Sequence, residues 1–191
     1  MKPTMCFNRP PRWLSMLPWV AALLLAGCAI PKYQPPAGAA ISQVRLYTTS
    51  SANASVIIGQ FPFCGGRKVY RTALLGVANL LSQPETLGMP SPPAVPASQM
   101  TEVAIETGRP LSILASSMQT LVISPSAPVF DTCRAEAYFE PQAGERYEAV
   151  FERPGTGVCT VSVVQLRAAS DGTWTRVPVS SLPKPSQACP N

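Results

Sequence analysis

The sequence contains no histidine at any of its 191 positions. Histidine titrates nearest to neutral pH and is the commonest metal ligand, so its absence excludes the usual general base, the Ser-His and Cys-His dyads and most zinc sites. No CxxC pair and no GxSxG motif is present either. We therefore expect no catalytic residue, no metal site and no cofactor, and predict that the protein is not an enzyme. A glycosidase-type pair of carboxylates is the remaining catalytic alternative.

Long apolar runs are also absent, except for one near the N-terminus. Lys2, Arg9 and Arg12 precede an apolar stretch at residues 13–25. A helix that spans a bilayer needs about 20 apolar residues, and this stretch is shorter and contains Pro18. A positive region followed by a short apolar region is the layout of a secretory signal peptide.

The apolar stretch ends in Leu25-Ala26-Gly27-Cys28, which resembles the lipobox of bacterial lipoproteins. The resemblance implies that the Cys28 thiol is the lipid attachment site and that the signal is cleaved just before Cys28. The new amine of Cys28 would then receive a palmitate-type acyl chain. Residue 29 is Ala rather than Asp, so the resemblance also implies transport to the outer membrane, with the protein facing the periplasm. The alternative is an ordinary cleaved signal with a chance cysteine.

Acidic residues are missing from the first 84 positions, and all ten lie within residues 85–171. The signal holds three positive charges, so its removal lowers the formal charge from +5 to +2. This small excess predicts no nucleic-acid partner. The acid-free part could face anionic lipid headgroups or cell-wall glycan, or its charges could simply be solvated.

Composition divides the chain into three parts. Residues 1–27 are the expected signal peptide, and residues 28–40 are the lipidated cysteine with a proline-rich tether. Twelve extended residues of such a tether reach roughly 35 to 40 Å. Residues 41–191 are the size of one domain with its own hydrophobic core, and we predict a single β-sandwich there.

Four cysteines remain beyond the lipobox in a chain predicted to be exported. An even number in an oxidising compartment indicates two disulfides, for which three pairings exist. We favour Cys133–Cys159, because both residues flank neighbouring predicted strands. Cys64–Cys189 would then tie the C-terminal tail to the domain.

Short alternating and β-branched segments dominate residues 41–191, which indicates an all-β fold, a sandwich with Greek-key-like topology. Residues 102–106 and 111–114 are expected to form a hairpin around Gly108. The predicted strands are residues 43–47, 55–60, 102–106, 111–114, 121–123, 134–140, 147–153, 158–167 and 173–177.

One stretch departs from this alternation. In residues 68–82 the apolar side chains recur at helical spacing, and Pro84 would stop a helix. We predict one short helix there, although Gly76 weakens it; an apolar loop over the sandwich is the alternative. If exposed, the apolar residues 69–81 would suit a partner surface.

Residues 139–147 end one strand at Pro141 and open the next at Tyr147. This resembles the tyrosine corner of Greek-key sandwiches, in which the tyrosine hydroxyl bonds to the upstream backbone. Residues 133–164 also resemble a segment of uncharacterised small β-rich lipoproteins of Gram-negative bacteria, a resemblance that implies no known activity.

Together these features predict a lipid-anchored, non-enzymatic binding or assembly module of the Gram-negative cell envelope. Its partners would be the membrane, through the N-terminal lipid, and another envelope protein. The alternative is a lipoprotein that binds peptidoglycan or polysaccharide. Trp174, the one tryptophan beyond the signal, is the candidate ligand contact for that alternative, because an exposed indole can stack on a sugar ring; a core or hairpin aromatic is the other interpretation.

Overall fold

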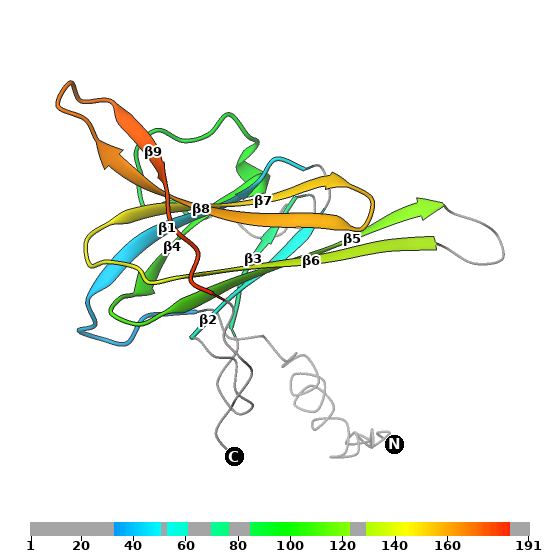
Figure 1. The fold of residues 1–191 in the computed structure, drawn as a ribbon, viewed down its shortest axis with the longest axis horizontal. Helices are drawn as coiled ribbons and strands as arrows, with labels where there is room; N and C mark the ends of the chain where they lie inside the picture. The colour runs from blue at the N-terminus through cyan, green and yellow to red at the C-terminus, as the bar shows by residue number, and fades with distance from the viewer. Residues whose placement is uncertain (1–32, 51–52, 61–69, 77–84, 123–128, 184–191) are drawn as a thin grey trace, which may run out of the picture. The chain divides into compact units, whose positions relative to one another are not determined.

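Figure 1 shows the fold as a computed structural model, which describes residues 33–50, 53–60, 70–76, 85–122 and 129–183. Within these ranges the structure is predominantly β-strand and contains no α-helix. One short 3₁₀ helix, η3 (Ala97–Gln99), precedes β4. The strands are β1 (Ile41–Thr48), β2 (Ala54–Gln60), β3 (Tyr70–Leu75), β4 (Met100–Glu106), β5 (Leu111–Val122), β6 (Val129–Phe139), β7 (Arg146–Gly155), β8 (Val158–Ala168) and β9 (Trp174–Pro178).

The strands form two sheets that face each other. Sheet A has five strands in the order β4-β1-β7-β8-β9, and sheet B has four in the order β3-β2-β5-β6. Strands β1 and β7 run parallel, whereas the other described pairs are antiparallel. The prediction of an all-β, sandwich-like fold is therefore confirmed, and the described strands lie in one compact unit.

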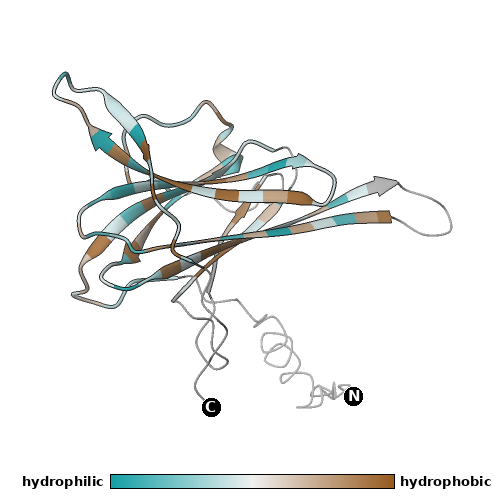
Figure 2. Ribbon diagram, viewed as in Figure 1, coloured by the Kyte–Doolittle hydropathy of each residue, from teal (hydrophilic) through white to brown (hydrophobic). Residues whose placement is uncertain are grey.

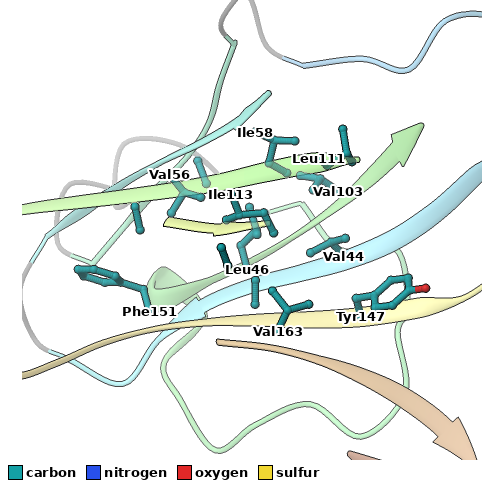
Figure 3. Packing of buried hydrophobic residues seen from close by; sticks show 14 of the residues in the cluster. Val44, Leu46, Val56, Ile58, Val103, Leu111, Ile113, Tyr147, Phe151 and Val163 are labelled. Carbon is teal, nitrogen blue, oxygen red and sulfur yellow. The ribbon is translucent and has the colours of Figure 1, made fainter. Parts of the chain in front are cut away.

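The core lies between the sheets because alternate residues of each strand point inward. Val44 and Leu46 of sheet A meet Val56, Ile58 and Ile113 of sheet B, and all five are almost fully buried (Figure 3). Figure 2 shows the same alternation as brown and teal bands along the strands. The period-two pattern of the sequence thus places its apolar half in one shared core.

The predicted tyrosine corner is present where the chain crosses from sheet B to sheet A. The buried Tyr147 hydroxyl accepts a hydrogen bond from the backbone N–H of Gln142 at 3.0 Å. The Tyr147 ring lies 5.2 Å from that of Phe139, between ring centroids. This contact fixes the bend between β6 and β7.

The helix predicted over residues 68–82 is wrong where the structure describes it, because Tyr70–Leu75 forms strand β3. Ala73 and Leu75 alternate into the core, and β3 completes an antiparallel pair with β2. Gly76 follows with a φ of 94°, which ends the strand. A sheet partner overrides the weak helical spacing, since pairing satisfies the backbone and buries two side chains. The remainder of the predicted helix lies outside the described residues.

The predicted hairpin around Gly108 is also wrong. Strand β4 pairs with β1 in sheet A, whereas β5 pairs with β2 and β6 in sheet B. The turn therefore crosses the sandwich, so the buried faces of β4 and β5 meet across the core. The predicted strand at residues 121–123 is, at Leu121 and Val122, the end of the twelve-residue β5.

The first described residue, Tyr33, lies within the predicted tether and packs against the core. Its hydroxyl accepts a hydrogen bond from the N–H of Glu106 at 3.1 Å. The predicted tether is therefore attached to the domain from Tyr33 onward, at the end of the sandwich where β1 begins. In the part of the chain that the structure describes, no helix is long and apolar enough to span a membrane.

Candidate functional site

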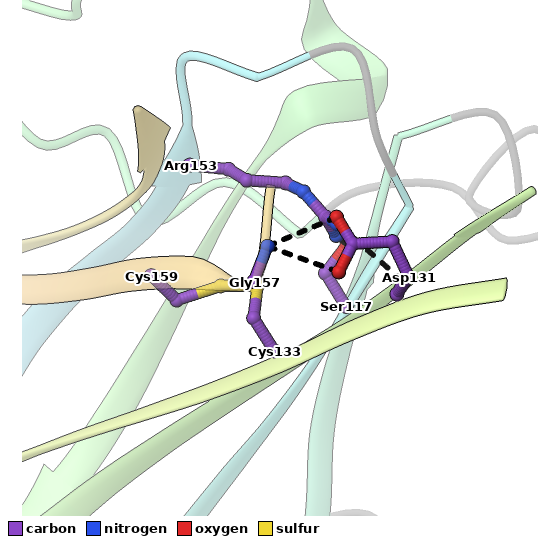
Figure 4. The surroundings of a disulfide bond; sticks show 6 residues. All are labelled: Ser117, Asp131, Cys133, Arg153, Gly157 and Cys159. Carbon is purple, nitrogen blue, oxygen red and sulfur yellow. Dashed lines mark hydrogen bonds and ion pairs between the residues drawn. A yellow bond between two sulfur atoms is a disulfide. The ribbon is translucent and has the colours of Figure 1, made fainter. Parts of the chain in front are cut away.

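Of the cysteines singled out in the sequence, Cys133 and Cys159 form a disulfide, as predicted. It joins β6 of sheet B to β8 of sheet A, with 5.7 Å between the two Cα atoms (Figure 4). Cys28, Cys64 and Cys189 lie outside the described residues, so one of the two predicted disulfides is observed.

A buried polar cluster lies beside this disulfide. The guanidinium of Arg153 pairs with Asp131 and donates to the Ser117 hydroxyl at 3.2 Å. Both carboxylate oxygens of Asp131 also accept from the N–H of Gly157 at 3.0 Å. Gly157 has a φ of 68°, a conformation that suits glycine in the β7–β8 turn. The cluster fastens that turn to strands β5 and β6 (Figure 4).

A second polar cluster lies on the outer face of sheet A, away from the core. Arg45 is fully buried between Glu102 and Glu148, its neighbours on β4 and β7. Its guanidinium lies 2.9 Å from a Glu102 oxygen and 2.5 Å from a Glu148 oxygen. Arg176 of β9 binds the other Glu148 oxygen at 2.6 Å. Two positive and two negative side chains thus form a neutral network.

This network holds residues 85–95 against sheet A. Arg45 donates to the carbonyls of Met89 and Pro90 at 2.6 and 3.1 Å. The second oxygen of Glu102 accepts from the N–H groups of Leu87 and Met89 at 2.5 and 3.2 Å. We call residues 85–95 the strap, because side chains of the sheet bind its backbone from below.

The strap contains one non-glycine residue in the left-handed region, Ser91, with a φ of 51°. Its carbonyl accepts from Arg45 at 3.3 Å and from Arg176 at 2.9 Å. Such a backbone conformation costs free energy and persists where the surroundings fix it. The two arginines therefore stabilise the turn of the strap.

Both clusters are structural in their chemistry. The carboxylates of Asp131, Glu102 and Glu148 are all occupied by arginine or backbone donors, an arrangement that orders a fold rather than transfers protons. Within the described ranges, no group of three or more Asp, Glu, Cys or His residues is arranged to hold a metal ion.

Trp174, the predicted ligand contact, lies at the start of the edge strand β9 and is half-buried. The guanidinium of Arg146 lies over its ring, 5.3 Å from the centroid. This cation–π contact occupies a ring face that a stacked sugar would use. Trp174 pairs with Ala168, at the opposite end of β8 from Cys159, so the structure does not bring it together with the Cys133–Cys159 disulfide.

The apolar segment 69–81 was the predicted partner surface, and two of its described side chains are not available for that role. Ala73 and Leu75 lie in the protein's own core. The structure instead exposes a different set of large apolar side chains on sheet B and beside it. Met118, Val129, Phe130 and Val158 are each at least half exposed.

Three of these residues belong to the β5–β6 arm, by which we mean residues 118–122 and 129–132. The arm extends beyond β2, whose pairing with β5 reaches only Ser117 (Figure 1). The β7–β8 turn, with Val158, lies at the same end of the sandwich. A signal for the arm was present in the sequence, since residues 110–130 contain no charged side chain. The alternation of apolar residues did not show that this stretch extends beyond the rest of the sheet.

Beside the arm, the outer face of sheet B carries a groove of about 550 Å³. Met118 and Leu74 supply apolar walls, and Thr132 and Arg134 line it from β6. A second hollow of about 470 Å³ continues along β6 from Arg134 to Tyr138. Two hollows that share Arg134 thus follow β6 along its outer face.

The second hollow is polar. Glu136 accepts a hydrogen bond from the Ser112 hydroxyl at 2.6 Å. Burial, together with a hydrogen bond to Glu136 and the charge of that carboxylate, raises the pKa of Tyr138 to about 12. Tyr138 is therefore neutral at physiological pH and can act as a donor beside the carboxylate.

No family model, curated protein or solved structure matches this chain. We therefore infer function from the geometry of the chain itself.

Proposed function

We propose that the protein is a lipid-anchored, non-enzymatic module of the Gram-negative cell envelope that binds a partner protein. The observation that carries this proposal is the exposed apolar arm at one end of the sandwich. Cys28 is the proposed lipid attachment site, and the outer membrane, on its periplasmic side, is the proposed location.

The position of the arm supports a protein partner over the anchoring membrane. The chain enters the domain near Ile41, which pairs with Glu106, and β5 begins at the same end. Strand β5 then runs for twelve residues away from this end, about 40 Å at roughly 3.3 Å per residue. Cys28 lies five positions before Tyr33 in the sequence, a separation that spans at most about 18 Å. The arm therefore extends away from the end of the sandwich at which β1 begins, which favours a partner other than the anchoring membrane.

The energetics of the arm also favour a partner. A two-stranded ribbon is marginally stable by itself in water, and here it exposes Met118, Val129 and Phe130. Burial of a large apolar side chain contributes about 1.5 to 3 kcal/mol, so three such residues can supply a useful interface. A polar partner such as a glycan would not bury them.

The test is site-specific crosslinking in living cells. A photoreactive amino acid at Met118 should crosslink to one envelope protein, and the same probe at the exposed Thr175 should not. The Cys28→Ser variant should lose the crosslink together with membrane attachment. Crosslinks to glycan alone, or an equal pattern from both positions, would contradict the proposal.

The finer architecture is also proposed. We infer that Cys64 and Cys189 form a second disulfide and that the connections follow a Greek key. The even number of cysteines in an exported domain supports the disulfide, and the tyrosine corner supports the topology. Peptide mapping without reduction should recover the Cys64–Cys189 pair, and free thiols at these positions would refute it.

A further inference from the structure

Strand β6 is an edge of sheet B. In an antiparallel ladder, alternate residues bond to the neighbouring strand and the residues between them point the opposite way. The carbonyl of Tyr138 accepts from the N–H of Leu182 at 2.9 Å, so the backbone N–H and C=O groups of Tyr138 point away from β5. The backbone groups point the same way at every second residue of β6, which includes Thr132, Arg134 and Glu136. Among the described residues, their outward N–H and C=O groups have no hydrogen-bond partner.

The two edges of sheet A, β4 and β9, differ from β6. On β4, the N–H of Glu102 already donates to the carbonyl of Glu85 at 2.8 Å. On β9, the outward-pointing residues include Pro178, which has no N–H, and Arg176, which is paired with Glu148. Proline and charge are the usual protections of an edge strand. The β6 edge has no proline between Val129 and Phe139.

The hollows along β6 would accept side chains of an extended segment that adds to this edge as a further strand. In that mode of recognition, main-chain hydrogen bonds supply affinity and pockets for alternate side chains supply specificity. Met118 and Leu74 form an apolar wall near Thr132. Arg134 is exposed and has no ion pair among the described residues, so it would attract an acidic side chain.

We propose that an extended segment of the partner protein adds to β6 as an antiparallel strand, in continuation of the Leu182–Tyr138 bond. Its residue opposite Arg134 is acidic, and the residue opposite Thr132 is apolar and enters the groove beside Met118. Antiparallel order matches every described pair of sheet B. The inference rests on the proposed function and specifies the chemistry of the partner.

A designed peptide tests this mode directly. The probe Lys-Thr-Glu-Thr-Leu-Thr-Val places Lys, Glu and Leu opposite Glu136, Arg134 and Thr132, and is added to the full mature chain in detergent. We expect it to slow the hydrogen exchange of the Thr132 and Arg134 amides. N-methylation of its Glu and Leu should weaken binding at least about tenfold, since two backbone hydrogen bonds are lost. N-methylation of its first two threonines, which face away from β6, is the matched control.

Equal weakening by both methylated peptides would overturn the proposal, as would binding that leaves the β6 amides unprotected. A peptide in which Lys replaces the Glu should bind the parent protein more weakly than the original peptide does. The Arg134→Ala variant should bind the two peptides equally. If the chain instead dimerises through this edge, sedimentation will show a dimer, and the commitment to a separate partner is wrong.

A second pair of variants separates this inference from the proposed function. Thr132→Pro removes one outward N–H without removing a bond to β5, and Thr132→Ala retains it. Thermal unfolding verifies that both variants fold. We expect the in-cell crosslink from Met118 to be lost in Thr132→Pro and kept in Thr132→Ala. A crosslink kept in both would refute strand addition and leave the proposed function standing, whereas its absence from the unmodified chain would refute the proposed function.

Discussion

The two outer faces of the sandwich are built in opposite ways. The outer face of sheet A is covered by the strap, and its strands β1, β4 and β7 bury Arg45, Glu102 and Glu148. The outer face of sheet B carries hollows and ends in an arm with exposed apolar residues. One face thus buries charge, and the other exposes apolar surface, in a single domain.

This difference indicates which face stabilises the fold and which is available to a partner. On the outer face of sheet A, the guanidinium of Arg45 donates to two carboxylates and to strap carbonyls, so its charge is satisfied within the protein itself. On sheet B, the outward backbone groups of Thr132, Arg134 and Glu136 have no partner among the described residues, and the side chains of Met118 and Phe130 are exposed. Substitutions should therefore affect stability on sheet A and binding on sheet B.

The largest effect is expected from Arg45→Met. It leaves the buried carboxylates of Glu102 and Glu148 without their central partner, and removal of one member of a buried ion network costs about 3 to 5 kcal/mol. Arg109→Met is the control, because Arg109 is exposed and its only described ion pair, with Glu106, spans 4.0 Å; such pairs contribute about 0 to 1 kcal/mol. Urea unfolding measures both, and equal losses would remove the contrast.

The next effect is expected from replacement of both Cys133 and Cys159 by Ser. The disulfide closes a loop with a sequence separation of 26 residues, which stabilises by about 3 to 4 kcal/mol in the loop-entropy model. The free energy of unfolding should fall by that amount, and the Met118 crosslink should survive wherever the variant remains folded. A variant as stable as the parent protein would show that the core and the Arg153–Asp131 cluster hold the sheets together without the disulfide.

A smaller effect is expected from Tyr147→Phe. The N–H of Gln142 loses its acceptor, and a net loss of about 0.5 to 1.5 kcal/mol follows. Chemical denaturation should show this shift with an unchanged denaturant slope. No measurable change would mean that water replaces the hydroxyl at the corner.

Alkaline pH should affect sheet B through Tyr138, whose pKa of about 12 lies above the ordinary value of 10. The folded state keeps this proton while the unfolded chain releases it, so the stabilisation is complete below pH 10 and is lost as pH rises towards 12. Tyr138→Phe should flatten this decline relative to the parent protein. If the free energy of unfolding of the variant falls equally steeply with pH, the decline is due to Tyr47 and Tyr147, whose pKa values burial also raises.

The smallest effect on stability is expected from Met118→Ser. The side chain is 60% exposed, and surface substitutions are usually within about 0.5 kcal/mol. Binding should nevertheless fall sharply, measured as crosslink yield from a probe at Phe130. A large loss of stability would mean that the arm packs against the protein itself.

Much of the fold followed from local patterns. Alternation identified β1, β7 and β8, and the Pro-Gly-Tyr spacing identified the corner at Tyr147. The disulfide between Cys133 and Cys159 was predicted from their flanking strands. Prediction failed at β3 and at the β4–β5 turn, because the partner of a strand depends on residues far away in the sequence. Leu75 can complete a sheet only if β2 lies beside it.

The sequence by itself determined the β-rich composition and the alternation that fills one core, because these depend on residues close together in the chain. The signal peptide at the N-terminus stays a prediction from the same kind of local pattern. Only the tertiary structure decided that Arg45, Glu102 and Glu148 are buried together. Their pattern is that of solvent-facing positions, and they become buried because a strap remote from β1 lies across them. Tertiary structure likewise decided that Met118 and Phe130 are exposed, since β5 and β6 extend beyond the strands that would have covered them.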